Sequence, residues 1–294
     1  MRAITIEIIN VVLPVFLITA VGYIFGKKRK INLSAINDFV IYLATPALII
    51  SSLSEDPIDL AIAGKVFLSV CIVIGISLVL GLIVIRAMKL HVKVYLPPVL
   101  FANTGNMGLP LVLFAFGEAG FNVAILYMVS TTVIHYTLGI YILSYDESPF
   151  EVLKLPLVYS AVAGVLLSIS GWELPVAIFR SVHLLGEASI PVMIFALGYK
   201  LSEVAIKDVG KSFMAGGMRI LFGVILGVLS VRLLHLEGVE ASVVILLAAM
   251  PPAVFNFVLA DRYNQDSETV ASIILAGTLI SAVTTPVIIA FLLN

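Results

Sequence analysis

Two short stretches of amide, glycine and proline residues interrupt long apolar runs, and they hold the side chains best suited to bind a ligand. The first contains Asn103, Thr104 and Asn106 and closes with Pro110. Proline removes a backbone N–H and glycine weakens a helix by about 1 kcal/mol, so the sequence predicts a broken helix here. The free N–H groups at such a break favour an anion such as a carboxylate or phosphate.

The second stretch contains Met250, Pro251, Pro252 and Asn256, and its alignment with the first places Asn256 opposite Pro110. Unwound backbone inside a membrane must be satisfied by protein or by a water-filled cavity. Interrupted segments at matching positions of two halves indicate a transport site. The alternative is a pair of kinks whose amides only hold neighbouring helices together.

Four more side chains in or near the apolar runs are candidates for ion coupling or for the substrate path. His135, close to Thr131, could carry a coupling proton or could be a neutral histidine hydrogen-bonded between helices. Glu187 could line the path or lie near the outer face. Arg219 could attract an anion, although a side chain that extends to the lipid headgroups is the favoured interpretation.

The composition indicates the elements that must position these residues. The chain has 294 residues, of which 61% are hydrophobic and 12% charged, and its mean hydropathy is +1.16. Soluble domains carry about 25% charged residues, so we expect an all-α integral membrane protein. Ten candidate spans of about 20 residues leave no room for a soluble nucleotide-binding domain. The expected spans are 5–26, 33–53, 62–85, 94–117, 120–145, 154–171, 176–199, 211–234, 239–262 and 267–293.

Charge placement predicts the orientation of these spans. The basic cluster 27–30 follows the first span, and most of the 17 Lys and Arg residues fall on the same side of the membrane. The acidic loop 55–59 falls on the other side. We therefore expect a multi-pass protein of the cell membrane with both termini on the non-cytoplasmic side.

The two halves of the chain, 1–150 and 151–294, resemble each other in an ordered set of positions. Pro14 matches Pro156, and Pro46 matches Pro191. Because each half has five spans, an odd number, the second copy must be inverted in the membrane. Inverted repeats are typical of secondary transporters, whose substrate site lies where the repeats meet.

Several classes of function are excluded. The net charge of −1 offers no basic face for nucleic acid. The sequence has none of the standard hydrolase, metalloprotease, nucleotide-binding or metal-binding motifs. We expect neither an enzyme nor a cofactor or metal site. Cys71, the single cysteine, is interpreted as a small buried apolar residue.

The residues 103–104 followed by 107–111 resemble the fourth helix of the auxin efflux carrier family. That family includes plant PIN-type auxin exporters and bacterial malate or malonate permease-like proteins. The run 247–263, with Met250, Pro251 and the closing residues 260–263, also resembles its counterpart in that family. The resemblance extends over the whole chain.

The resemblance implies two inverted five-helix repeats whose broken helices, 4 and 9, cross beside the substrate. It implies a scaffold of helices 1, 2, 6 and 7 that forms a homodimer, and a moving transport domain of helices 3–5 and 8–10. Pro110 would be the first crossover proline. Asn256 stands where plant members have the second.

The sequence therefore predicts a secondary transporter that carries a small carboxylate, such as an auxin-like acid, malate or malonate, by an elevator mechanism. Its expected partners are this substrate and the lipid bilayer. Two alternatives remain open at this point. One is a sodium-coupled symporter of the bile-acid type, and the other is a membrane sensor that binds a ligand without transporting it.

Overall fold

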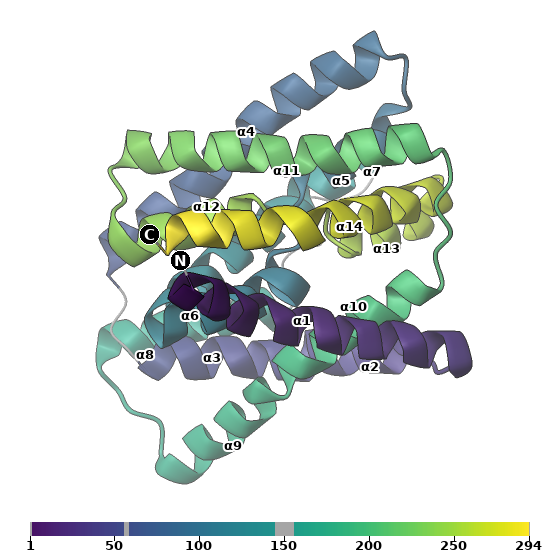
Figure 1. The fold of residues 1–294 in the computed structure, drawn as a ribbon. Coiled ribbons are helices and arrows are strands. Elements are labelled where there is room, and N and C mark those ends of the chain that lie inside the picture. The colour runs from purple at the N-terminus through teal and green to yellow at the C-terminus, as the bar shows by residue number, and fades with distance from the viewer. Residues whose placement is uncertain (1, 56–58, 145–155, 294) are drawn as a thin grey trace.

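A computed structural model describes residues 2–55, 59–144 and 156–293, and every regular element in these ranges is helical (Figure 1). Three short π-helical turns, η1 to η3, each lead directly into an α-helix. The elements are α1 (Arg2–Lys28), α2 (Leu33–Phe39), η1 (Val40–Ala44), α3 (Thr45–Glu55), α4 (Leu60–Ala87), α5 (Val92–Leu100), η2 (Thr104–Gly108), α6 (Leu109–Ile134), η3 (His135–Gly139), α7 (Ile140–Leu143), α8 (Pro156–Ser170), α9 (Val176–Glu187), α10 (Ser189–Ser202), α11 (Val209–Leu234), α12 (Gly238–Ala248), α13 (Phe255–Arg262) and α14 (Ser267–Leu292).

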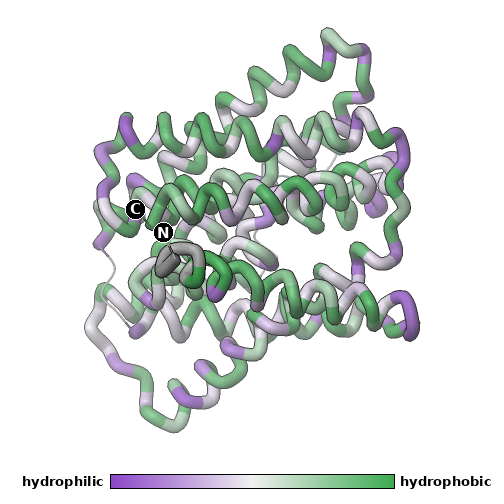
Figure 2. Tube along the Cα trace, viewed as in Figure 1, coloured by the Kyte–Doolittle hydropathy of each residue, from purple (hydrophilic) through white to green (hydrophobic). Residues whose placement is uncertain are grey.

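Seven helical stretches in the described ranges are long and apolar enough to cross a membrane. Two shorter apolar helices, α8 and α12, accompany them. Hydrophobic residues cover most of the length of the helices, and hydrophilic residues gather mainly at their ends (Figure 2). The seven stretches are Ile8–Lys28, Ala35–Glu55, Leu60–Ala87, Thr104–Leu143, Val176–Ser202, Val209–Leu234 and Ser267–Leu292.

The stretch Thr104–Leu143 covers parts of two expected spans, 94–117 and 120–145, and it changes direction between them. Gly117 has a non-helical backbone with φ 64° and ψ −162°. A positive φ is readily adopted only by glycine, so this residue divides α6 where the sequence predicts the boundary. The predicted division of the chain between residues 150 and 151 lies outside the described residues.

The helices pack in two groups. In the first group α1 packs against α10, and α3 packs against α8 and α9. In the second, α11 packs against α14, α12 and α4, and α6 packs against α12 and α4. In Figure 1, α1, α2, α3, α8 and α9 lie in the lower part of the view, whereas α4 and α11 lie in the upper part.

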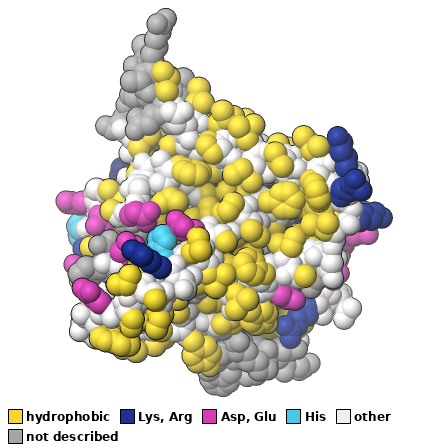
Figure 3. Space-filling model, turned by 90° about the horizontal axis from the view of Figure 1, so that it is seen from below, with side chains coloured by type: hydrophobic (Ala, Val, Ile, Leu, Met, Phe, Trp, Pro, Cys, Tyr) yellow, Lys and Arg dark blue, Asp and Glu magenta, His cyan; other side chains and the backbone are white. Residues whose placement is uncertain are grey.

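The two ends of the molecule differ in charge. Lys and Arg side chains gather at one end, and Asp, Glu and His side chains gather at the other, with a broad hydrophobic belt between them (Figure 3). The basic end includes the exposed side chains of Lys27 and Lys28, where α1 finishes. Both chain termini lie at the opposite end from this basic cluster (Figure 1).

Candidate functional site

Two breaks in the helices meet in the interior of the molecule. One separates α5 from η2, and the other separates α12 from α13. Ala102 and Pro252 form an isolated antiparallel bridge at the point of contact. Two backbone hydrogen bonds flank it, from the N–H of Asn103 to the oxygen of Pro251 (2.8 Å) and from the N–H of Ala253 to the oxygen of Phe101 (2.9 Å). Each break therefore satisfies the other's backbone, as unwound segments inside a membrane require.

The position of the crossing corrects the expectation for Pro110. The chains cross at Ala102 and Pro252, whereas Pro110 is buried in the first turn of α6. The helical run already begins at Thr104 with η2, so Pro110 follows this π-helical turn, and the N–H that it lacks removes one hydrogen bond within the run. Asn256 lies in the first turn of α13.

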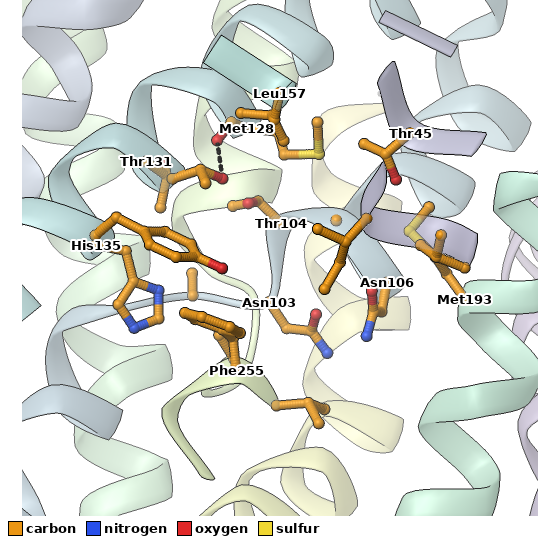
Figure 4. Close-up of a pocket in the computed structure, with 18 residues that line it drawn as sticks. Thr45, Asn103, Thr104, Asn106, Met128, Thr131, His135, Leu157, Met193 and Phe255 are labelled. Atoms are coloured by element: carbon orange, nitrogen blue, oxygen red, sulfur yellow. Dashed lines mark hydrogen bonds between the residues drawn. The ribbon is translucent and has the colours of Figure 1, made fainter. Parts of the chain in front are cut away.

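A cavity of about 170 Å³ lies beside the crossing. Five of the predicted site residues line it: Asn103, Thr104, Asn106, Thr131 and His135 (Figure 4). Its lining contains no Asp, Glu, Lys or Arg among the described residues. The cavity is therefore a neutral site in which amides and hydroxyls face apolar side chains.

Two polar atoms in this lining have no hydrogen-bond partner within the described part of the chain. They are Nδ2 of Asn103 and Oγ1 of Thr131, in side chains that are 4% and 5% exposed. Buried polar groups nearly always have a partner, which can be a ligand or ordered water. Asn103 can donate to a ligand oxygen, and the Thr131 hydroxyl can donate or accept.

The N-terminal ends of both helices that follow the breaks border the same cavity. Thr104, Gly105 and Asn106 supply the first turn of the helix that continues into α6, and Val254 and Phe255 lie at the start of α13. A helix N-terminus carries about +0.5 of an elementary charge and unpaired N–H groups. Two such ends at one neutral cavity favour an anionic ligand.

Arg219 lies on the other side of the crossing, and its position contradicts the favoured sequence interpretation. Its side chain is 1% exposed, so it does not extend to the lipid headgroups. Its guanidinium donates to the carbonyls of Val99 (3.2 Å) and Leu100 (2.7 Å) in α5 and of Ala248 (2.5 Å) in α12. It thus joins the C-terminal, electronegative ends of both half-helices with one positive charge. Gly223 allows this approach because a Cβ there would collide with the Ala248 carbonyl.

His135 connects the cavity to the second break. Its Nε2 lies 3.0 Å from Oδ1 of Asn256. Its ring stacks on Phe101 with 3.9 Å between centroids, and the ring of Phe255 meets it edge-on at 5.4 Å. The imidazole is therefore held from two elements in addition to its own helix.

The remaining predicted site residues lie away from the cavity. Met250, Pro251 and Pro252 are buried at the crossing, but they are not part of the lining. Glu187 is exposed, with its carboxylate 3.7 Å from the imidazole of His183, and it does not line the cavity.

The sequence analysis did not identify the residues that line the cavity from the first helix group. Thr45 lies at the start of α3, and Met193 lies in α10. Each is next to or near one of the matched prolines of the repeat, Pro46 and Pro191. The match between Pro46 and Pro191 was the feature of the sequence that could have identified Thr45 and Met193. The hydrogen bond between Thr45 and Ser189 (3.3 Å) shows that the two segments are in contact.

Comparison with known proteins gives a consistent result. A family described as "membrane transport protein" matches residues 7–154 and 146–289. An uncharacterized transporter of Methanocaldococcus jannaschii is 27% identical, over 92% of this chain and 94% of its own length. A putative malonate transporter of Rhizobium meliloti is 25% identical, over 95% of this chain and 93% of its own length. Auxin efflux carrier component 8 of Arabidopsis thaliana is 33% identical over 39% of this chain and 32% of its own length.

Proposed function

This chain belongs to the membrane transport protein family, the family of the auxin efflux carriers, and we propose that it is a secondary transporter of a small organic anion. It is a multi-pass membrane transporter and not an enzyme. The observation that carries the proposal is the meeting of two half-helix N-termini at one cavity. The unpartnered donors of Asn103 and Thr131 support it, because a carboxylate supplies the acceptors that they lack.

The substrate is a small carboxylate such as malonate, malate or an auxin-like acid. The cavity of about 170 Å³ is smaller than the roughly 300–1,000 Å³ of pockets for drug-sized ligands. One relative is named a putative malonate transporter, and others are named auxin efflux carriers. The polar groups of the lining suit a carboxylate, and apolar residues such as Ile41, Leu157 and Met193 suit a compact carbon body.

The transport mechanism is an elevator in which one helix group moves against the other. The fold would comprise ten spans in two inverted repeats, 1–150 and 151–294. The scaffold consists of α1–α3 and α8–α10, and the transport domain consists of α4–α7 and α11–α14. Two observations support this division: the helices pack in these two groups, and the cavity is lined from both. Relative movement of the groups would open the cavity to either side.

The scaffold would also form a homodimer in a cell membrane, with both chain termini on the non-cytoplasmic side. The position of both termini at the end opposite the basic cluster supports this orientation (Figure 1). Chemical labelling in intact cells, applied to single cysteines introduced near the two ends of the chain, tests on which side of the membrane these ends lie. Cross-linking of the purified protein tests the dimer.

Uptake into proteoliposomes tests the proposed function. Vesicles that contain the purified protein and are preloaded with unlabelled malonate, malate or indole-3-acetate are diluted into the same labelled acid. We expect uptake above that of protein-free vesicles for at least one acid. No uptake of any of the three would refute the proposal. Uptake that requires sodium would favour the sodium-coupled alternative, and saturable binding without uptake would favour a sensor.

Substitution of the cavity amides tests the location of the site. Asn103→Ala and Asn106→Ala should each reduce uptake at least several-fold while leaving the melting temperature close to that of the wild type. Asn10→Ala, which alters an exposed amide on α1, is the matched control. Equal loss of folding and of transport in the cavity variants would show that the amides only stabilise the break.

A further inference from the structure

His135 carries the one imidazole in the described cavity lining. The lining includes one other titratable group, the phenol of Tyr136 beside it. The elements packed against His135 contribute Phe101, Phe255 and Asn256, none of which is ionisable. The inference below rests on the proposed function, because it concerns what accompanies the carboxylate into this cavity.

Asn256 determines which nitrogen of His135 can gain or lose a proton. The amide Nδ2 of Asn256 faces two carbonyl oxygens, those of Ala253 (3.0 Å) and Phe101 (3.4 Å), which can only accept hydrogen bonds. The amide nitrogen must therefore point to these carbonyls and the amide oxygen to His135. Because that oxygen is an acceptor, Nε2 of His135 must carry its hydrogen in both charge states of the ring.

The other ring nitrogen, Nδ1, is then the atom that takes up a proton. No described residue forms a hydrogen bond with it. Figure 4 shows the imidazole at the edge of the cavity, on the same side as Thr131, with one ring nitrogen directed toward the interior of the cavity. The stacked ring of Phe101 and the edge-on ring of Phe255 keep the imidazole in this orientation.

The burial of the site couples the proton to the anion. His135 is 5% exposed, and the cavity lining holds no charge that could compensate an imidazolium. A carboxylate entering alone would lack a full counter-charge in the same way. A single buried charge is costly, whereas a hydrogen-bonded pair of opposite charges compensates most of that cost. Each ligand therefore raises the affinity of the cavity for the other, and by the same factor.

We propose that Nδ1 of His135 is a proton-binding site that is filled together with the substrate, so that one proton moves with each carboxylate bound. The proton comes from the aqueous phase to which the cavity is open and returns to water when the carboxylate leaves on the other side. No covalent bond other than N–H forms or breaks. Asn256 acts as a positioning residue, because it keeps Nδ1 free for this proton.

Calorimetric titration of the purified wild-type protein with malonate, in two buffers of different ionisation enthalpy, measures the protons taken up per ligand. We expect close to one proton per malonate bound, and an affinity that weakens about tenfold per pH unit between about pH 7 and pH 8. His135→Gln should take up no proton, and its affinity should change less than twofold over this range. His183→Gln, an exposed histidine on α9, is the matched control and should behave as the wild type.

The outcomes separate the two proposals. Malonate binding to the wild type without proton uptake overturns the role of His135 but leaves the carrier intact. Binding that needs sodium and takes up no proton does the same and identifies a different coupling ion. Failure to bind malonate, malate and indole-3-acetate alike refutes the proposed function itself. The proton count of the wild type remains decisive even if His135→Gln does not fold.

Discussion

Replacing Arg219 with methionine should destabilise the protein through the two half-helix ends that this side chain joins. Methionine fills a similar volume but cannot donate to the carbonyls of Val99, Leu100 and Ala248. Each carbonyl left unsatisfied costs about 1–3 kcal/mol. Removal of the buried cation offsets part of this free-energy cost, because burying a charge is itself unfavourable. We therefore take the lower bound for the three carbonyls and expect a net loss of about 3 kcal/mol.

The loss is measurable as thermal denaturation of the purified protein in one detergent and at one scan rate. A change of 1 kcal/mol shifts the melting temperature of chains of 150–250 residues by about 2–4 °C. The lower value applies to this longer chain of 294 residues, so a decrease of about 6 °C is expected for Arg219→Met. The melting temperature of Arg219→Lys should lie between those of Arg219→Met and the wild type. A single ammonium lacks the planar fork that lets arginine donate to carbonyls on two helices at once.

Arg232→Met is the control, because Arg232 is an exposed arginine in the last turn of the same helix, α11. It should shift the melting temperature by about 2 °C or less, since a cation at an exposed helix end contributes about 0.3–1 kcal/mol. If Arg219→Met melts within about 1 °C of the wild type, the bridging role assigned to Arg219 is wrong. An equal loss in both variants would point to a general effect of removing positive charge.

Three further predictions concern single residues. Thr131→Val should weaken malonate binding about fivefold, which is the effect of losing a hydrogen bond of about 1 kcal/mol. It should not lower the melting temperature, because the hydroxyl has no partner among the described residues. A marked loss of stability would contradict this prediction. Gly117→Ala should destabilise the protein by about 1 kcal/mol in the same melting assay. The positive φ of this residue is the only cause expected, since a Cβ there would meet no atom within 4 Å. An unchanged melting temperature would show that alanine is not strained at this turn. Asp266→Ala should cost about 1 kcal/mol at neutral pH, because Asp266 caps α14. Hydrogen bonds from the hydroxyl and N–H of Thr269 hold the pKa of Asp266 below its usual 3.8, so in melting curves recorded against pH this contribution should be complete above pH 3.8 and decline only as the pH falls through the lowered pKa. A decline already near neutral pH would contradict the assignment.

The sequence by itself determined the class of protein and the positions of its interruptions. Long apolar runs are local in the chain, and their length alone indicates helices that cross a membrane. Proline and glycine act on their own turn of helix, so the breaks near residues 103–110 and 249–256 could be predicted without knowing what surrounds them. The side chains of Asn103, Thr104 and Asn106 were predicted from the first break, and His135 with its neighbour Thr131 from the presence of an ionisable group in an apolar run. The structure places all five around one cavity.

Only the tertiary structure decided which of these groups meet. The crossing at Ala102 and Pro252, rather than at Pro110, depends on the register between two segments far apart in the chain. Arg219 was expected to extend to the lipid headgroups because the sequence shows its depth in the helix. The sequence does not show the carbonyls on other helices that accept its hydrogen bonds. Whether a buried charge is tolerated depends on partners from other helices, and packing alone brings these partners together.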